Sequence, residues 1–257
     1  MSSHAPVLTD DRAGGVRIIT LDRPPANAID DTLLEALDHT LGDAETDVAV
    51  RALVVTGNGP FFCAGFDLRA PQRGDAESAR VVQLYRSAHR RLLAMPKPTV
   101  ALINGHAVAG GLVIALGCDV RIGVSEPATI GLNEVAIGAS FPTAAIEIVR
   151  ARLSAAAASE LTLQAELRPL ADGLALGIVE RLLPRAGALD EAIATAARLG
   201  AYPREVFAHT KRSLVADALA RIDAVPMSAE LEIAALWSAA ESRVARAAQR
   251  TALSNRR

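Results

Sequence analysis

The chain has 257 residues, of which 51% are hydrophobic and 22% are charged. This composition allows a sizeable core, suits one α/β domain with room for a helical appendage, and argues against a disordered chain. The 27 basic and 29 acidic residues give a net charge of −2, and only 3% of the residues are aromatic. Without a basic surface or aromatic platforms for bases, we expect no nucleic-acid partner and no membrane partner.

The cysteines do not predict a disulfide framework or a metal site, and the N-terminal residues do not predict a targeting peptide. Cys63 and Cys118 belong to no CxxC pair or Cys/His cluster, so we predict neither a disulfide framework nor a metal site. The first residues lack a signal-peptide pattern, and Asp10 and Asp11 disfavour a transit peptide. The longest run without charged residues, Pro98–Cys118, is interrupted by polar residues and a glycine pair, which favours strand, turn and helix over a membrane span. We therefore expect a soluble, cytoplasmic protein.

Short β-rich runs alternate with helical patterns along the first half of the chain. Strands are predicted at Val16–Leu21, Arg51–Thr56, Val100–Ile103, Val120–Val124 and Thr129–Ile130. A T-x-x-E motif at Thr32 predicts the capped start of a helix whose leucines, up to Leu41, share one face. A long amphipathic helix is predicted over Ala76–Met95, before Pro96. Strands that alternate with helices are typical of a parallel sheet with helical crossovers.

After about Phe141 the pattern becomes helical. Helices are predicted at Ala144–Arg152, Ala155–Leu167, Ala171–Leu176, Leu189–Leu199, Arg204–Leu219 and Ser228–Thr251, with a possible strand at Val179–Leu183. No glycine- and serine-rich linker and no internal repeat divides the chain. We therefore expect one α/β body over residues 1–200, followed by a C-terminal helical region over residues 201–257.

Two glycine-containing turns follow apolar strands and are candidates for chemistry. In Phe61–Leu68, the small pair Ala64-Gly65 would let the backbone come close to a ligand. The alternative is a packed turn in which Asp67 caps the next helix. In Asn104–Leu112, a helix start near Gly111 would present unpaired N–H groups to a carbonyl oxygen, as in an oxyanion hole made by the main chain. The alternative there is a helix start packed closely against a neighbouring strand.

An isolated carboxyl group lies in a third segment. Between Glu126 and Glu147 the only ionisable side chain is Glu134, in the apolar segment Ile130–Gly138. An apolar environment raises the pKa of a carboxyl group toward the range that suits proton transfer. The alternative is a solvated loop glutamate or a helix cap. Two donor turns and one isolated carboxyl group together suggest enolate chemistry, in which main-chain N–H groups stabilise a thioester oxyanion while a glutamate moves the α-proton.

The motifs around these segments resemble the crotonase (enoyl-CoA hydratase/isomerase) superfamily over nearly the whole chain. The matching segments are Leu21–Ile29, Arg51–Leu68, Ala101–Asp119, Ile130–Gly138 and Gly177–Leu183. The pair C-A-G-x-D-L and N-G-x-A-x-A-G-G is the most specific part of this match. The resemblance implies an α/β, crotonase-like spiral of ββα units with a C-terminal helical trimerisation subdomain. It also implies an acyl-CoA thioester as substrate, with coenzyme A as part of that substrate and no separate cofactor, and self-association as a trimer or a dimer of trimers.

The resemblance also implies roles for individual residues. The two oxyanion N–H groups would belong to Phe66 and Gly110, and Glu134 would be the acid–base. Coenzyme A and the acyl group would lie against Ala26, Ala28, Ala64, Asp67, Leu68, Gly111 and Val113, with Arg23 as a phosphate partner. A histidine at the position of His106 is more often a hydrogen-bonded neighbour than a catalyst.

Departures from the family pattern favour one activity. Hydratases use a second glutamate, on the helix after the second turn, and Val113 stands at that position. Their glycine-rich turn is replaced here by Ser140–Ala144, whereas Ile130–Glu134 looks like the single-glutamate Δ3,Δ2-enoyl-CoA isomerases. One carboxyl group suffices for a 1,3-proton shift, but hydration must also activate water. We therefore predict an isomerase that moves a double bond from position 3 to position 2. The alternatives are a hydratase, which converts a 2-enoyl-CoA to a 3-hydroxyacyl-CoA, and a catalytically quiet acyl-CoA-binding homologue.

Overall fold

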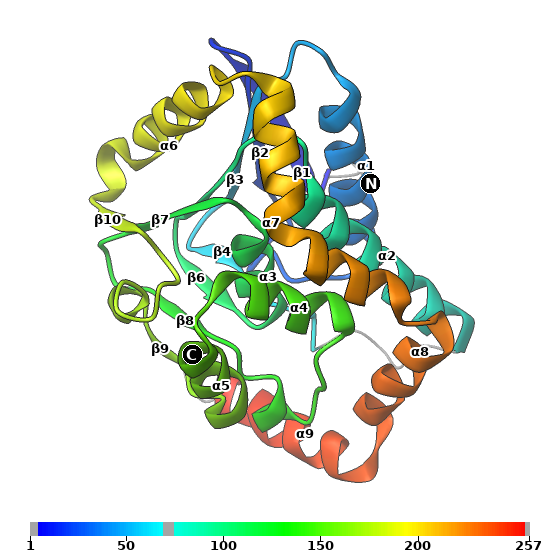
Figure 1. Cartoon of the computed structure of the whole chain (residues 1–257). Helices are drawn as coiled ribbons and strands as arrows, with labels where there is room; N and C mark the ends of the chain where they lie inside the picture. Colours follow the sequence, from blue (N-terminus) through cyan, green and yellow to red (C-terminus); the bar gives the residue numbers. More distant parts are fainter. Residues whose placement is uncertain (1–4, 69–74, 255–257) are drawn as a thin grey trace.

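The computed structural model describes residues 5–68 and 75–254, and its strands form two sheets (Figure 1). The larger sheet has the order β1-β2-β3-β5-β7-β10, and only β1 runs antiparallel to its neighbour among the described strands. Its strands are β1 (Val7–Arg12), β2 (Val16–Leu21), β3 (Ala52–Gly57), β5 (Thr99–Ile103), β7 (Val120–Val124) and β10 (Arg181–Leu183). The smaller sheet consists of β4 (Phe61–Cys63), β6 (His106–Val108), β8 (Thr129–Gly131) and β9 (Arg168–Pro169), in that order. Strands β4, β6 and β8 are parallel, whereas β9 is antiparallel to β8.

Three consecutive units share the same path between the sheets. In the pairs β3–β4, β5–β6 and β7–β8, the first strand joins the larger sheet and the second joins the smaller one. Each pair leads to helical structure, namely α2 (Asp75–Ala94), α3 (Gly110–Gly117), and the short 3-10 turn η1 (Val135–Ile137) followed by α4 (Thr143–Arg152). This repeated path confirms the predicted spiral of ββα units.

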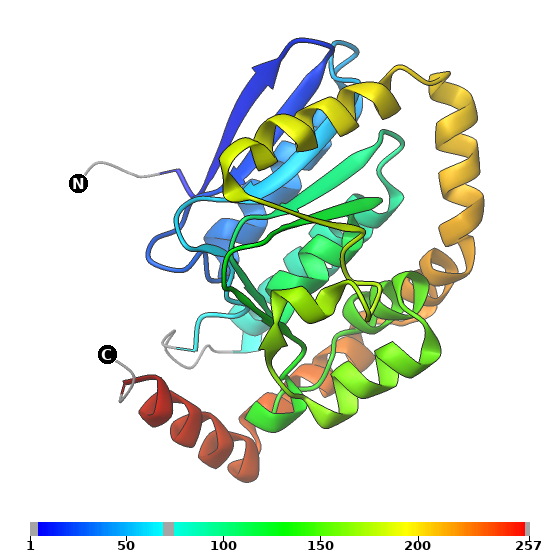
Figure 2. The ribbon, with the colours of Figure 1, turned by 90° about the vertical axis from the view of Figure 1, so that its left-hand side faces the viewer.

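Helices cover both faces of the larger sheet: in Figure 2 the yellow helix lies in front of the strands, and the blue and teal helices lie behind them. Helix α6 (Arg185–Gly200) packs across β2, β3, β5 and β7, and α1 (Asp31–Thr46) packs beside β1 and β2 with α2 against it. The central strands are accordingly continuous apolar runs, such as the fully buried Leu53–Val55, because neither face meets water. All eight residues of α3 are buried as well, so this helix lies inside the protein.

The C-terminal helices pack on the body instead of extending away from it. Helix α7 (Arg204–Ala224) contacts α2 and α4, and α8 (Met227–Ala235) contacts α2. Helix α9 (Ala240–Ser254) lies at the lower end of Figure 1 and contacts η1. The division of the chain near residue 200 stays a prediction. No helix within residues 5–68 and 75–254 is both long enough and apolar enough to cross a membrane.

Several predicted helices have different bounds in the structure. The helix predicted over Ser228–Thr251 is wrong as one element, because the 3-10 turn η4 (Leu236–Ser238) and the extended Ala239 separate α8 from α9. The helix predicted over Ala155–Leu167 consists of α5 (Ala155–Ser159) and a π-helical turn, η2 (Glu160–Gln164). Only a 3-10 turn, η3 (Leu170–Gly173), forms where a helix over Ala171–Leu176 is predicted.

The start of α1 also differs from its prediction. Asp30 is the N-cap, and its side chain accepts a hydrogen bond from the Leu33 N–H at 2.9 Å. The Thr32 hydroxyl lies inside the helix and donates to Asp30 Oδ1 at 2.7 Å, so the capping box at Thr32 is wrong. A carboxylate at the N-cap satisfies a helical N–H and also favours the positive end of the helix dipole, which explains why Asp30 displaces Thr32.

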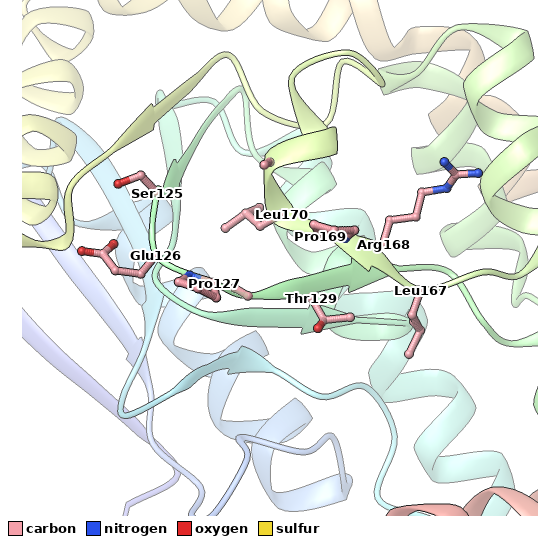
Figure 3. Close-up of a pocket in the computed structure, with 10 residues that line it drawn as sticks. Ser125, Glu126, Pro127, Thr129, Leu167, Arg168, Pro169 and Leu170 are labelled. Atoms are coloured by element: carbon pink, nitrogen blue, oxygen red, sulfur yellow. The ribbon is translucent and has the colours of Figure 1, made fainter.

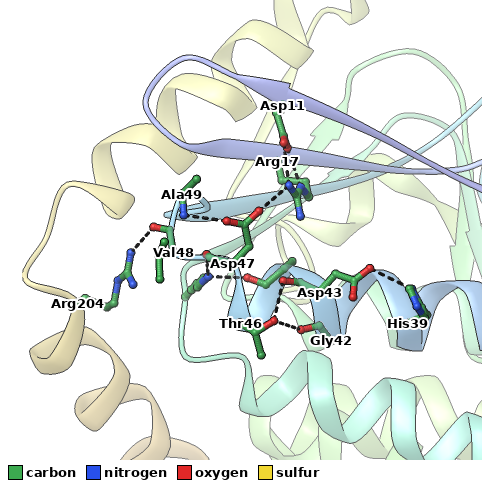
Figure 4. A network of polar contacts seen from close by, with 12 residues as sticks. Asp11, Arg17, His39, Gly42, Asp43, Thr46, Asp47, Val48, Ala49 and Arg204 are labelled. Atoms are coloured by element: carbon green, nitrogen blue, oxygen red, sulfur yellow. Dashed lines mark hydrogen bonds and ion pairs between the residues drawn. The ribbon is translucent and has the colours of Figure 1, made fainter.

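A polar network ties the first hairpin to the end of α1 and the start of α7 (Figure 4). Arg17 on β2 pairs with Asp11 at 2.6 Å and with Asp47 at 3.0 Å. Asp47 follows α1 and also accepts the Ala49 N–H at 2.9 Å. Arg204, at the start of α7, donates to the carbonyl oxygen of the intervening residue 48 at 3.0 Å. These contacts join segments far apart in the sequence, so the network has a structural role.

Candidate active site

The three candidate segments of the sequence meet at one edge of the smaller sheet. The first turn follows β4, the second follows β6, and Glu134 lies three residues after the end of β8. Strands β4, β6 and β8 are neighbours and run parallel, so their carboxyl ends lie at the same edge. Loops at the carboxyl ends of parallel strands are the usual location of ligand sites in α/β proteins. We call the N–H groups of Phe66 and Gly110 together with the Glu134 side chain the candidate site.

Glycine is required where the first two turns touch. Gly65 has a φ of +77°, and a Cβ atom there would lie 2.8 Å from Ala109 Cβ and 3.4 Å from Gly110 N. A Cβ atom on Gly111 would lie 2.2 Å from the Cys63 carbonyl oxygen. Neither position has room for a side chain, and Gly65 also needs a conformation that favours glycine. The main chains of the two turns are therefore in direct contact.

The hydrogen bonds around Phe66 set the direction of its N–H. The Gly65 carbonyl accepts the Ile29 N–H at 2.7 Å, and the Asp67 N–H donates to the Ile29 carbonyl at 2.9 Å. Since the N–H groups of successive residues in an extended chain point to opposite sides, the Phe66 N–H points away from Ile29. Gly110 begins α3, and its N–H is one of the first helical donors, which have no acceptor within the helix. The two turns thus supply two adjacent main-chain donors beside the positive end of a helix dipole.

The buried Asn27 side chain holds the first turn in place through hydrogen bonds to main-chain groups. Its amide donates to the carbonyl oxygens of Asn58 at 3.0 Å and Phe61 at 2.9 Å, and its side-chain oxygen accepts the Arg23 N–H at 3.0 Å. The residue is only 2% exposed and has a φ of +51°. Asparagine tolerates this conformation better than most residues, and its amide can satisfy main-chain groups on both sides. This accounts for the asparagine in the P-P-x-N motif of the sequence.

Ala109 joins the second turn to the segment that carries Glu134. Its N–H donates to the Gly131 carbonyl at 2.7 Å. Its φ of 52° and ψ of −132° lie outside the conformations that an alanine usually adopts. Such strain persists only where the surrounding structure holds the residue in place, and it concentrates at functional sites.

Glu134 is a buried carboxyl group without a cationic partner among the described residues. Its relative exposure is 8%, and its Oε2 atom makes no hydrogen bond. Burial raises the pKa of Glu134 to about 8, because removal from water disfavours the charged form. Helix α9 covers the turn after it, since a Cβ atom on Gly138 would lie 2.4 Å from Ser242 Cα. The side chain is therefore neither in bulk solvent nor a helix cap with its oxygens satisfied.

Two further residues bear on the chemistry. Val113, which is expected at the position of the second glutamate of hydratases, is fully buried in α3 and offers no group that could bind a proton. Glu230 on α8 is 2% exposed; its Oε2 accepts the Thr143 N–H at 3.3 Å and its Oε1 makes no hydrogen bond. Glu230 was not a candidate from the sequence, because it lies in an alanine-rich helix with alternating charges, where a glutamate normally faces solvent.

The residues expected to contact coenzyme A lie along the first turn. The Ala64 N–H donates to the Ala26 carbonyl at 3.1 Å, and Arg23 donates to the Ala28 carbonyl at 3.1 Å. The Arg23 guanidinium also pairs with Asp30 at 2.8 Å and with Asp67 at 3.0 Å. Its charge is therefore engaged by two carboxylates. All the ligand contacts expected from the sequence stay predictions: phosphate binding by Arg23, and contacts with coenzyme A or the acyl group by Ala26, Ala28, Ala64, Asp67, Leu68, Gly111 and Val113.

His106 links two strands of the smaller sheet. Its Nδ1 atom accepts the Thr129 N–H at 3.0 Å, and its ring lies 4.8 Å from that of Phe61. This is the hydrogen-bonded neighbour that the sequence favours. Within the described residues no group of three or more histidine, cysteine or acidic side chains could hold a metal ion, and Cys63 and Cys118 are free and buried.

A hollow beside β8 and β9 is separate from the candidate site (Figure 3). It is lined by residues 125–129 and 167–171, with Glu126 and Arg168 toward its opposite ends. Glu126 accepts the Arg185 N–H at 2.9 Å, and Arg168 pairs with Glu160 at 2.7 Å. Neither Glu134, Phe66 nor Gly110 lines this hollow, so the reactive groups lie elsewhere.

Comparison with known proteins assigns the family. The model of the enoyl-CoA hydratase/isomerase family matches residues 11–243. The chain belongs to this family. The structure of human mitochondrial Δ3-Δ2-enoyl-CoA isomerase is similar with a TM-score of 0.92 and 26% sequence identity, covering 98% of this chain and 99% of that one. The crotonase fold predicted for the chain is thereby confirmed, with its two sheets and C-terminal helices.

Other members of the family are named either as enoyl-CoA isomerases or as enoyl-CoA hydratases. An enoyl-CoA isomerase of Mycobacterium tuberculosis has a TM-score of 0.77 and 31% identity, covering 90% of this chain and 98% of that one. A Thermus thermophilus protein, provisionally named an enoyl-CoA hydratase, is 39% identical over 189 residues, which are 71% of this chain and 74% of that protein. The chain is therefore an enzyme of CoA thioester metabolism in the hydratase/isomerase family.

Proposed function

We propose that the protein is a Δ3,Δ2-enoyl-CoA isomerase that uses Glu134 as its single acid–base group. The observation that carries this proposal is a buried Glu134 with an unpartnered oxygen, on a segment that the Ala109–Gly131 hydrogen bond joins to the second donor turn. The resemblance to the family implies that the apolar Val113 stands where a hydratase has its second glutamate. The high structural similarity to the human mitochondrial isomerase supports it.

The proposed reaction is a 1,3-proton shift through a dienolate. The N–H groups of Phe66 and Gly110 hold the thioester oxygen and stabilise the negative charge that develops on it. The Glu134 carboxylate removes a proton from C2, and the electron pair of the C2–H bond enters the dienolate. The Glu134 carboxyl group then returns the proton to C4, so the double bond moves from position 3 to position 2. A carboxylate whose pKa is near 8 is a far stronger base than a solvated one, which suits removal of this weakly acidic proton.

Hydration of a 2-enoyl-CoA is the second candidate function. It is favoured by the provisional name of the Thermus thermophilus relative, at 39% identity. Addition of water requires one group to activate the water and another to protonate carbon, and Val113 can do neither. The isomerase therefore fits the described residues better.

The deciding experiment presents 3-enoyl-CoA and 2-enoyl-CoA thioesters to the purified protein side by side. Double-bond position and 3-hydroxyacyl-CoA are followed in the same samples. We expect conversion of the 3-enoyl to the 2-enoyl thioester, with water addition at least about tenfold slower because Val113 supplies no second acid–base group. Rapid hydration of the 2-enoyl thioester without isomerisation would overturn the proposal. Binding of either thioester with no turnover would identify a quiet acyl-CoA-binding homologue.

We also propose self-association as a trimer or a dimer of trimers through the C-terminal region. Support comes from exposed apolar side chains on α7, where Val206 is 64% and Leu214 is 77% exposed. Such side chains would be covered in an assembly. Light scattering coupled to size-exclusion chromatography should give three or six times the 26.8 kDa mass of one chain, and a monomeric mass would contradict the proposal.

A further inference from the structure

Tyr85 is a buried phenol that contacts both main-chain donor residues of the candidate site. It lies on α2 and is 2% exposed. Its ring stacks on the Phe66 ring, with the centroids 5.3 Å apart and the planes at 21°. Its other neighbour is the His89 ring, at 3.8 Å and 21°. The three rings form a column that fixes the position of the phenol.

The hydroxyl end of Tyr85 lies beside Gly110. A Cβ atom on Gly110 would be 3.7 Å from the Tyr85 hydroxyl oxygen and 3.7 Å from its Cε2 atom. No hydrogen bond joins this hydroxyl to any of the described residues. Tyrosine hydroxyl groups of buried side chains usually have a hydrogen-bond partner, so this one is available to donate. A polar ligand between the two turns would supply the missing partner.

The surroundings keep this hydroxyl protonated and its ring in place. The pKa of Tyr85 lies well above its usual value, first because of burial and then because the carboxyl group of Glu134 is close. The Nδ1 atom of His89 bonds to the Tyr85 carbonyl oxygen at 2.8 Å, and burial lowers the pKa of His89 to about 4. A neutral imidazole therefore packs against the phenol without adding charge, and Tyr85 is a hydrogen-bond donor throughout the neutral range.

We propose that the Tyr85 hydroxyl is a third hydrogen-bond donor to the thioester oxygen, and hence a catalytic residue. The inference rests on the proposed function only in placing that oxygen at the N–H groups of Phe66 and Gly110. The hydroxyl is close to Gly110, has no other partner among the described residues and belongs to a ring held on both faces. Negative charge develops on the oxygen only as the enolate forms, so this donor strengthens its hydrogen bond in the transition state.

The test replaces the hydroxyl alone. Tyr85→Phe keeps the stacked ring and its volume, and Tyr202→Phe is the matched control. Tyr202 is 46% exposed, and its hydroxyl accepts a hydrogen bond from Arg198 at 3.1 Å. The readout is exchange of the α-proton of an acyl-CoA thioester into deuterated water, which reports enolate formation whether the enzyme isomerises or hydrates. We expect Tyr85→Phe to lower kcat for exchange about 10- to 100-fold with KM changed less than about twofold, and Tyr202→Phe to leave both unchanged.

A second variant separates donation from packing. 3-Fluorotyrosine at position 85 keeps the ring and makes the hydroxyl a stronger donor, so its exchange rate should equal or exceed that of the wild type. Wild-type exchange by Tyr85→Phe, or equal loss in both variants, would overturn the inference. Hydration instead of isomerisation by the wild type would overturn the proposed function alone, whereas no exchange at all by the wild type would overturn both.

Discussion

Buried polar groups have partners at the C-terminal end of α3, whereas at its N-terminal end they lack them. At its C-terminal end, cations satisfy the last carbonyls: Arg152 donates to Leu116 O at 3.2 Å, and Arg121 donates to Cys118 O at 3.1 Å. Asp119 follows and pairs with Lys211 at 2.8 Å and with Arg152 at 3.1 Å. At the N-terminal end lie the first helical N–H groups, and the Ala109–Gly131 hydrogen bond joins this end to the segment that carries the unpartnered oxygen of Glu134.

This contrast separates groups that stabilise the fold from groups kept for a ligand. Burying a polar group without a partner costs about 1–3 kcal/mol, and at the C-terminal end of α3 each charge named above has a partner. Burial by itself therefore does not mark a site. Buried polar groups that lack partners do indicate a site, and such groups lie at the N-terminal end of α3.

The largest effect on activity should come from Glu134, compared here with the buried Glu147. Glu134→Gln removes the base but keeps the shape, so we expect α-proton exchange to fall about 10³-fold while acyl-CoA binding persists. Glu147, 3% exposed, is the matched control, because Arg150 at 3.0 Å and Arg221 already pair with it. Glu147→Gln should keep exchange near the wild-type rate and lower the melting temperature. Retained activity in Glu134→Gln would remove that residue from the mechanism.

The next effect concerns the contact between the donor turns. Gly65→Ala places a Cβ atom 2.8 Å from Ala109 Cβ, so the turns must separate and exchange should fall about 10²-fold. Gly177 has a similar φ of +69°, but nothing lies within 4 Å of a Cβ atom there. Gly177→Ala should therefore cost only about 1 kcal/mol of backbone strain, with no loss of exchange. Equal rates for both variants in the exchange assay would show that the turns do not form a donor pair.

The pH dependence follows from the pKa of Glu134. Its carboxylate is the proposed base, and its pKa is about 8, so the active form increases as pH rises through this value. We expect kcat/KM to rise about tenfold per pH unit below 8 and to level off above it. A kcat/KM for isomerisation that is flat between pH 6 and 9 would contradict this assignment.

The free energy of unfolding should fall with rising pH below 8, where kcat/KM rises. In the folded protein Glu134 keeps its proton up to about pH 8, whereas in the unfolded chain it loses it near the ordinary value of 4.5. The folded state then binds more protons, so the free energy of unfolding falls as pH rises from 4.5 to 8. Urea unfolding of the wild type and of Glu134→Gln should differ progressively over this interval and by a constant amount above it.

The smallest effect on activity is expected at the C-terminal end of α3. Lys211 is 5% exposed and pairs with Asp119, which keeps Arg152 as its other partner. Lys211→Met should reduce the free energy of unfolding by about 1–3 kcal/mol and leave exchange unchanged. Loss of exchange at full occupancy of the folded state would show that the two ends of the helix are coupled.

Much of this arrangement was predictable because it depends on local pattern. The apolar runs gave the strands of the larger sheet except β1, whose residues are mostly polar and exposed, and Glu134 stood out as the only ionisable residue in an apolar segment. Strands β4 and β6, of three residues each, were not predicted, because so short an element has the same pattern as a turn. The contact between Gly65 and Gly110 depends on the pairing of those two strands, so the sequence could suggest the two donors but not their distance.

Residues that act through long-range packing were missed for a related reason. Tyr85 lies on the apolar face of an amphipathic helix, where an aromatic residue normally fills the core, and nothing local indicates an unpaired hydroxyl. The interruption between α8 and α9 contains neither glycine nor proline, so the sequence gave no reason to divide that helix. Asp30, the observed cap, also pairs with Arg23, a contact that the sequence does not reveal.

The donor groups of Phe66 and Gly110 belong to the main chain, and this affects what genetics can detect. A scan that truncates side chains would leave both peptide N–H groups intact, so a loss of activity at position 66 would report the stacking of its ring on Tyr85 and not the donor. The same scan would report position 65 as intolerant, although glycine has no side chain to contribute. Exchange of the amide for an ester at these two positions would delete the N–H groups and keep the side chains, and would therefore test the donors directly.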